Sequence, residues 1–316
     1  MKNSIAFVVD PQIQFSNPAN RIDNYFEALI KKLSFILNDN KYVIILGDLT
    51  EFPVLDMQGI IILTGMLQKH KMQGGQVYSL VGNHDIYNWN ISTISKTTLG
   101  LLSKLDLITI VDRSGEVPDS LVSVEFLNIE GWDIDCTLLK TPHNNLPIAK
   151  SDKSILIGHN YYNFARDPKH SLEYEEIANL GYRYIFLGHD HENYKPKALE
   201  QGILYRPGSL GRQTTHPYNF TRKIKYCQLD LDTDKVREIE VPFEPASEVF
   251  SLEAIEKHED TTPTYVYDLE ELMKNFKNKN TINMSIKKMM EDNPEIPDEI
   301  IDFIEQCHEA CQLEFV

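Results

Sequence analysis

Side chains that can bind metal ions follow five short apolar runs of this sequence. The clearest group is Gly82-Asn83-His84-Asp85, directly after the apolar residues 77–81. An amide oxygen, an imidazole and a carboxylate are therefore neighbours at a predicted strand end, although such a turn alone could simply cap a helix. The other four runs end in Asp10-Pro11-Gln12, Gly47-Asp48, Gly158-His159 and Gly188-His189-Asp190-His191.

Five similar strand ends indicate one shared site, because the carboxyl ends of parallel strands meet at the same edge of a sheet. Carboxylates, amides and imidazoles are common ligands of divalent metals. The first ion would take Asp10, Gln12, Asp48 and His191, and the second would take Asp48, Asn83, His159 and His189. Asp48 would then bridge two ions about 3.5–4 Å apart, as in two-metal hydrolases.

The charge of such a centre favours an anionic substrate. Two dications, two carboxylates and a bridging hydroxide leave about one net positive charge. This favours a phosphate ester over a peptide. The histidines outside the five strand ends have no such context, and we interpret them as structural: His70, His143, His170, His216, His258 and His308.

The elements around the first three strand ends alternate between strand and helix. Apolar strands are predicted at residues 5–9, 42–46 and 77–81. The alternation predicts a parallel sheet with right-handed crossovers. The two helices between the strands are predicted from apolar stripes, formed by Ile22, Tyr25, Phe26, Leu29, Ile30 and Leu33 and by Met57, Ile60, Ile61, Thr64 and Leu67.

The second half of the sequence predicts another sheet and then a separate region. Short alternating segments from about residue 105 to 140 indicate mostly antiparallel strands of a second sheet. Further strands are predicted at residues 154–157, 184–187, 203–205, 224–229 and 236–241, with a helix near 172–180. After residues 242–245 the sequence becomes helical and rich in Lys and Glu. We therefore place one domain at residues 1–244 and a second region at 245–316.

The composition is that of a folded, acidic protein. Of 316 residues, 42% are hydrophobic and 25% are charged, which is enough apolar sequence for a buried core. The net charge of −16 argues against a broad basic face for nucleic acid, although a metal cluster can supply positive charge locally. We see no signal-peptide pattern and no apolar run of about 18 residues. We therefore expect a cytoplasmic protein (host cytoplasm if a phage encodes it) that does not bind membranes.

The ordered motifs resemble those of the calcineurin-like metallophosphoesterases. That family carries Asp-x-His, Gly-Asp, Gly-Asn-His-(Asp/Glu), Gly-His and Gly-His-x-His blocks, and this chain matches four of the five across residues 10–191. The resemblance implies an α/β fold in which two β-sheets pack together with helices outside, an α/β/β/α sandwich. It also implies catalysis by a hydroxide that bridges the same two metals as Asp48. His84 would stabilise the transition state or protonate the leaving oxygen.

The first block departs from the family, because Gln12 stands where the motif has histidine. An amide oxygen can still bind a metal and is equally neutral. Three of the first ion's four protein ligands then become hard oxygens, which favours Mn²⁺, with Mg²⁺ as the alternative, over Zn²⁺.

Three further segments resemble the SbcD-type nuclease subunits of double-strand-break repair. They are residues 155–160, residues 205–210 with the sequence Tyr-Arg-Pro-Gly-Ser-Leu, and residues 236–242. This resemblance extends to about residue 245. It implies a DNA exo- or endonuclease that acts in recombination and repair with an SbcC-like coiled-coil ATPase, and a phage-encoded version fits the same pattern. A homodimer is compatible with it.

The C-terminal region carries one pattern of its own. After Pro297, an apolar stripe with acidic residues between its members is formed by Ile300, Ile301, Ile304, Cys307, His308 and Cys311. One interpretation is a helix packed on its own domain, and the other is a helix that docks on a partner.

Two kinds of enzyme fit the motifs. The first is the metal-dependent nuclease with its ATPase partner. The second is a phosphoesterase for small molecules or phosphoproteins, which the acidic charge favours. A metal-free scaffold would not need the complete set Asp48, Asn83, His84, His159, His189 and His191.

Overall fold

The computed structural model describes residues 1–139, 146–164, 170–216 and 218–251. The predicted region 245–316 and its apolar stripe after Pro297 lie almost wholly outside these residues and stay predictions. No helix among the described residues is long and apolar enough to cross a membrane.

The first sheet has seven strands, and its centre is parallel, as the strand–helix alternation predicts. β1, β2 and β3 carry the first three metal-binding motifs at their carboxyl ends, and β14 closes onto β1 in antiparallel direction. The spatial order is β15 (Lys235–Glu240), β14 (Lys225–Asp230), β1 (Lys2–Val8), β2 (Asn40–Ile45), β3 (Gln76–Ser79), β4 (Thr109–Val111) and β5 (Ser123–Val124).

The second sheet has six strands, of which the central four are parallel. β8 and β11 lie side by side at its centre and end at the other two motifs. The spatial order is β12 (Lys197–Ala198), β13 (Ile203–Tyr205), β11 (Tyr184–Gly188), β8 (Ser154–His159), β7 (Trp132–Cys136) and β6 (Phe126–Ile129). A two-stranded sheet joins β9 (Tyr161–Tyr162) to β10 (Ser171–Leu172).

The prediction for residues 105–140 is wrong in part. Of the four strands described in this stretch, only β6 and β7 form an antiparallel pair, which belongs to the second sheet. β4 and β5 instead extend the first sheet in parallel. Strands of two or three residues are too short to show which sheet they join, because their partners are set by tertiary packing.

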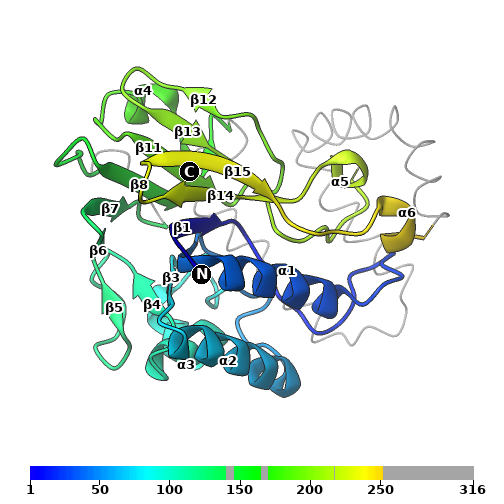
Figure 1. Cartoon of the computed structure of the whole chain (residues 1–316). Coiled ribbons are helices and arrows are strands. Elements are labelled where there is room, and N and C mark those ends of the chain that lie inside the picture. The colour runs from blue at the N-terminus through cyan, green and yellow to red at the C-terminus, as the bar shows by residue number, and fades with distance from the viewer. Residues whose placement is uncertain (140–145, 165–169, 217, 252–316) are drawn as a thin grey trace, which may run out of the picture. The chain divides into compact units, whose positions relative to one another are not determined.

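Helices cover the outer face of the first sheet (Figure 1). Asn24 and Asp56 cap the two long helices, since their side chains accept hydrogen bonds from the backbone N–H groups of Glu27 and Gln58. The helices are α1 (Tyr25–Asp39), α2 (Met57–Met72), the 3-10 helix η1 (Ile91–Lys96), α3 (Thr98–Lys104), α4 (Tyr174–Ile177), α5 (Tyr218–Thr221) and α6 (Ala246–Val249).

Three residues of the predicted helical stripes do not face the core. Ile22 precedes α1, and Met57 and Ile61 are exposed on α2. α2 buries Leu67 of the predicted stripe and also Leu63, which the stripe did not include. This helix is apolar around most of its circumference, so its periodicity does not determine which side is buried.

The two sheets pack face to face through apolar side chains of alternating strand positions. Ile5, Phe7 and Val9 point into this inter-sheet core, whereas Ala6 and Val8 point toward the helices. The Phe7 ring stacks on Phe186 of the second sheet with centroids 3.8 Å apart. Because β1 is buried on both faces, its sequence is a continuous apolar run. The result is the predicted four-layer sandwich.

Candidate metal centre

The two sheets bring their metal-binding strand ends together. Asp10, Asp48 and Asn83 follow β1, β2 and β3, whereas His159 ends β8 and His189 follows β11. His159 and His189 lie side by side, because Gly188 of β11 pairs with His159 of β8. The predicted convergence therefore occurs between two facing sheets.

One group of ligand atoms surrounds Nε2 of His159. This nitrogen lies 3.1 Å from His189 Nδ1, 3.2 Å from Asn83 Oδ1 and 3.4 Å from Asp48 Oδ2. Metal–ligand bonds of about 2.1 Å place neighbouring ligands about 3.0–3.4 Å apart. Asp48, His159 and His189 each offer an atom within 4.8 Å of the others. These four side chains, the predicted second ion's set, thus have the spacing of ligands around one cation.

The predicted first ion's residues lie next to this group. Asp10 is fully buried, with Oδ2 3.6 Å from His191 Nε2 and Oδ1 3.5 Å from His159 Nδ1. Gln12 is also buried, and its backbone N–H donates to the Asp48 carbonyl over 2.9 Å. The structure places Asp10, Gln12, Asp48 and His191 together but records no contact of the Gln12 amide group, so its role as a ligand stays a prediction.

The strand ends leave the sheet through strained backbone. Asp10, Gln12, Asp48 and His189 have φ values of 41°, 44°, 49° and 76°, in the left-handed region that non-glycine residues seldom adopt. Such strain costs about 1–3 kcal/mol per residue and clusters at functional sites.

Gly82 has no side chain, which allows the Asp48 loop to lie against its backbone. A Cβ at this position would lie 2.1 Å from Asp48 Oδ1 and 2.2 Å from the Asp48 backbone nitrogen. Asp85 closes the same turn by accepting hydrogen bonds from the Gly82 and Thr50 N–H groups. Asp85 therefore holds the loop, and the other polar residues of the motif face the centre.

Burial keeps two of the imidazoles neutral. Burial and repulsion from His159 lower the pKa of His189 to about 3, and burial lowers the pKa of His191 to about 4. Neutral imidazole is the form that binds a metal. Both side chains are thus ready to act as ligands near pH 7.

His159 carries the charge that offsets the buried carboxylates. Burial would lower the pKa of His159, but Asp48 and Asp10 outweigh burial and raise it. Its Nδ1–H group donates to the Leu46 carbonyl over 2.7 Å, which directs Nε2 at the ligand group. A cation at that point would replace the proton on Nε2 as the partner of Asp48.

The donor set fits divalent metals. Asp10 Oδ2 is buried and has no hydrogen-bond partner among the described residues. A buried, unpaired carboxylate oxygen is costly unless a cation compensates it. Two buried carboxylates, an amide oxygen and neutral imidazoles supply the oxygen and nitrogen donors that such ions use.

His84 lies beside the ligand group. Its backbone N–H donates to Asp48 Oδ1 over 2.9 Å, and its Nδ1–H group donates to the Glu51 carbonyl over 2.7 Å. Burial would lower the pKa of His84, but Asp48 and Glu51 outweigh burial and raise it. The side chain is one-third exposed, so its Nε2 is the nitrogen that can serve a substrate. Sequence reasoning missed Glu51, which belongs to no motif.

Aromatic rings line one side of the centre, and the sequence motifs did not point to them. The His189 ring lies 4.2 Å from Tyr161 and 6.2 Å from Trp89, measured between centroids. His170, interpreted from sequence as structural, stacks on Trp89 at 4.2 Å.

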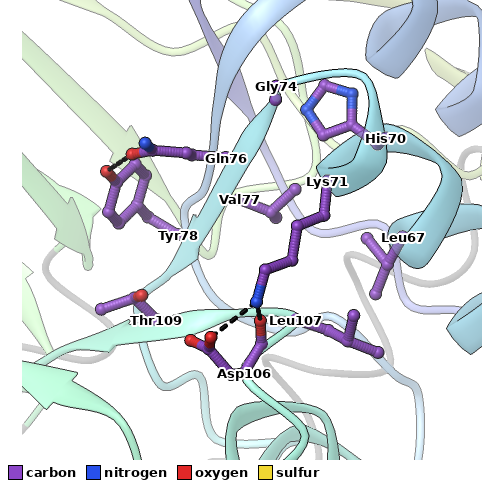
Figure 2. A pocket seen from close by; sticks show the side chains of 11 residues that line it. Leu67, His70, Lys71, Gly74, Gln76, Val77, Tyr78, Asp106, Leu107 and Thr109 are labelled. Atoms are coloured by element: carbon purple, nitrogen blue, oxygen red, sulfur yellow. Dashed lines mark hydrogen bonds and ion pairs between the residues drawn. The ribbon is translucent and has the colours of Figure 1, made fainter.

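A cavity of about 380 Å³ lies elsewhere (Figure 2). It is lined by Gln76, at the opposite end of β3 from Gly82, and by Lys71, which pairs with Asp106 over 2.6 Å. It therefore adds no residue to the metal centre.

Comparisons with known proteins identify the family of the chain. Residues 5–193 match the family of calcineurin-like phosphoesterases. No curated protein matches the chain. Among solved structures, the protein TT1561 of Thermus thermophilus is similar with a TM-score of 0.44 and 11% identity, over 76% of this chain and 99% of that one. A dimetal phosphatase from Danio rerio is similar with a TM-score of 0.48 and 12% identity, over 77% and 97%. Because the family match spans most of the two-sheet region, the chain belongs to the calcineurin-like phosphoesterases, a family of metal-dependent enzymes.

Proposed function

We propose that the protein is a two-metal phosphodiesterase that cleaves DNA as the nuclease subunit of an SbcCD-like complex. The observation that carries the phosphodiester chemistry is the pair of buried carboxylates beside His159. Asp48 Oδ2 lies 3.4 Å from His159 Nε2, and Asp10 lies 3.5 Å from Nδ1 of the same ring and 3.6 Å from His191. One carboxylate shared by two adjacent sets of donors is the arrangement that two-metal hydrolases need.

The proposed ligands form two sets, one for each ion. Asp48, Asn83, His159 and His189 would hold one ion, and Asp10, Gln12, Asp48 and His191 would hold the other. Bound divalent ions, with Mn²⁺ as our first choice and Mg²⁺ as the second, would activate a water and neutralise the phosphoryl oxygens. The Leu46 carbonyl holds the His159 ring in the tautomer that this requires.

His84 is the proposed acid catalyst. The Glu51 carbonyl fixes its Nδ1–H group, and the nearby Asp48 and Glu51 carboxylates stabilise the imidazolium. Its Nε2–H group can then stabilise charge on the phosphoryl group or give a proton to the leaving oxygen. The contact between the His84 backbone and Asp48 keeps the acid next to the ligands.

The choice of DNA rests on the SbcD-like segments at residues 155–160, 205–210 and 236–242. The segment at 205–210 begins with the last residue of β13. It holds the backbone of one predicted ligand, because the Ser209 N–H donates to the His191 carbonyl over 3.1 Å. An SbcC-like ATPase is the proposed partner, and the host or bacterial cytoplasm the proposed location. The net charge of −16 favours the second candidate, a phosphoesterase for small molecules or phosphoproteins.

A parallel assay separates the two functions. Purified protein with Mn²⁺ is given labelled single- and double-stranded DNA and, separately, p-nitrophenyl phosphate and a phosphopeptide. We expect cleavage of DNA that is lost in Asp48→Asn, which removes the shared carboxylate. Hydrolysis of the monoesters without cleavage of DNA would establish the second candidate.

A further inference from the structure

Four rings form what we call the aromatic flank of the metal centre: Trp89, Tyr161, Phe164 and His170. Tyr161 stacks on Phe164 at 4.5 Å and also contacts His189. Trp89 stacks on His170 and lies nearly perpendicular to the His189 ring, with an interplanar angle of 83°. The rings come from two loops, one after β3 and the other around β9 and β10. They thus meet at His189 from distant parts of the chain.

Trp89 occupies a position that suits glycine. Asn88 and Trp89 have φ values of 51° and 56°, and the Asn90 N–H donates to the Tyr87 carbonyl over 2.9 Å. Two positive φ values within this hydrogen bond define a type I′ turn, whose second central residue is preferably glycine. An L-residue there costs about 1–2 kcal/mol. A tryptophan in this place therefore needs a compensating role for its ring.

The ring is available to a ligand. Trp89 is half-buried, whereas Trp132, the other tryptophan of the chain, is fully buried. The centroid of the Trp89 ring lies 6.2 Å from that of His189, which places the indole about one side chain away from the ligand group. A substrate whose phosphate occupies the centre would have its neighbouring group beside this ring.

The net charge of the protein indicates how the part of the substrate next to the phosphate is bound. A net charge of −16 opposes binding through many phosphate contacts, which is the usual source of affinity for nucleic acid. Stacking of bases on aromatic side chains contributes about 1–3 kcal/mol per base and needs no positive charge. An acidic enzyme with an aromatic flank can therefore hold a nucleotide by its base.

We infer that Trp89 is a specificity-determining residue, which stacks against the nucleobase next to the phosphate held at the metal centre. This inference rests on the proposed action on nucleic acid and adds a ligand group to it. Binding would then depend on the base and only weakly on salt. The competing explanation is that the flank merely shields His189 from water.

Ligands with and without a base distinguish these explanations. Mg²⁺-loaded protein is titrated with 5′-dAMP and with deoxyribose 5-phosphate, which has the same phosphate but no ring. Calorimetry measures both affinities, and tryptophan fluorescence reports stacking because Trp132 is buried. We expect dAMP to quench the emission and to bind about 5- to 150-fold more tightly, as 1–3 kcal/mol requires.

Variants then assign the preference to the ring. Trp89→Ala should lose the preference for dAMP while keeping its affinity for deoxyribose 5-phosphate, and Trp89→Phe should retain most of it. Tyr87→Ala is the matched control, since Tyr87 is an exposed aromatic residue of the same turn. It should leave both affinities unchanged.

Each contrary result is distinct. Equal affinities of the wild type for the two ligands, or no detectable binding of either, would overturn the inference even if the protein cleaves DNA. Equal losses for both ligands in Trp89→Ala would show that the ring only protects the centre. A preference for dAMP without any cleavage of DNA would support the stacking role and contradict the proposed nuclease.

Discussion

Replacement of Gly82 by alanine should damage the metal centre without damaging the fold. The new Cβ would stand 2.1 Å from Asp48 Oδ1 and 2.2 Å from the Asp48 nitrogen. Ordinary contacts of a Cβ begin at about 3.4 Å, so the Asp48 loop must retreat by roughly 1 Å. Gly82 has no left-handed φ, and alanine therefore adds this steric conflict and no backbone strain.

A displacement of this size should have a large effect on catalysis. A misplacement of about 1 Å in a catalytic group can cost about 10²-fold in rate. Asp48 contributes to both proposed ion sites, so the affinity for Mn²⁺ should fall together with kcat. The assays are Mn²⁺ titration by calorimetry and hydrolysis of a phosphodiester at saturating metal.

Two other glycines provide controls. Gly65→Ala on α2 meets no atom within 4 Å, and it should preserve activity and stabilise the protein by about 1 kcal/mol. In Gly100→Ala the Cβ would lie 2.0 Å from the Ile94 carbonyl oxygen, so it should lower the Tm. If Gly82→Ala loses thermal stability as Gly100→Ala does but binds Mn²⁺ normally, the steric reasoning about Asp48 is refuted.

Four further outcomes follow from the same structure. Exhaustive chelation should abolish hydrolysis, and Mn²⁺ should restore it better than Mg²⁺; robust activity of chelated protein would contradict a metal centre. His84→Ala should keep both metals but lose about 10²-fold or more in kcat, and an equal loss of bound metal would show instead that His84 is a ligand. Gln12→Ala should weaken the first site in a Mn²⁺ titration while the second stays occupied, and Gln12→His should widen metal choice toward Zn²⁺; an unchanged first-site affinity would show that the amide is no ligand. Burial and three neighbouring arginines lower the pKa of Lys32 from 10.5 to about 7. Between pH 7 and 10.5 the unfolded state therefore binds more protons than the folded state, and stability rises with pH. Lys32→Met should raise the free energy of unfolding near pH 7 by about 1–4 kcal/mol in denaturant titrations, and it should lose the rise of stability with pH.

The sequence predicts the ends of the buried strands better than the faces and partners of the other elements. Strand ends are readable because a buried parallel strand is a continuous apolar run and its motif follows at once, as at Asp48 and Asn83. The buried face of α2 cannot be predicted from its sequence, because Met57 and Ile61 are as apolar as the residues that the helix buries. The short β4 and β5 are assigned to a sheet only by their partners.

Contacts between distant loops also remain outside the reach of the motifs. Glu51 holds His84 through its backbone carbonyl, which any residue type could supply. The approach of Trp89 and Tyr161 to His189 depends on the packing of two loops far apart in the chain. Such contacts have no local periodicity or spacing, so the sequence carries no signal for them.

Anomalous diffraction from crystals of the Mn²⁺-loaded protein would locate both proposed ions. We expect two manganese peaks about 3.5–4 Å apart, with the Asp48 carboxylate between them. One ion would bind Asn83, His159 and His189, and the other Asp10 and His191. A single peak, or two peaks that do not share Asp48, would contradict the two-metal centre.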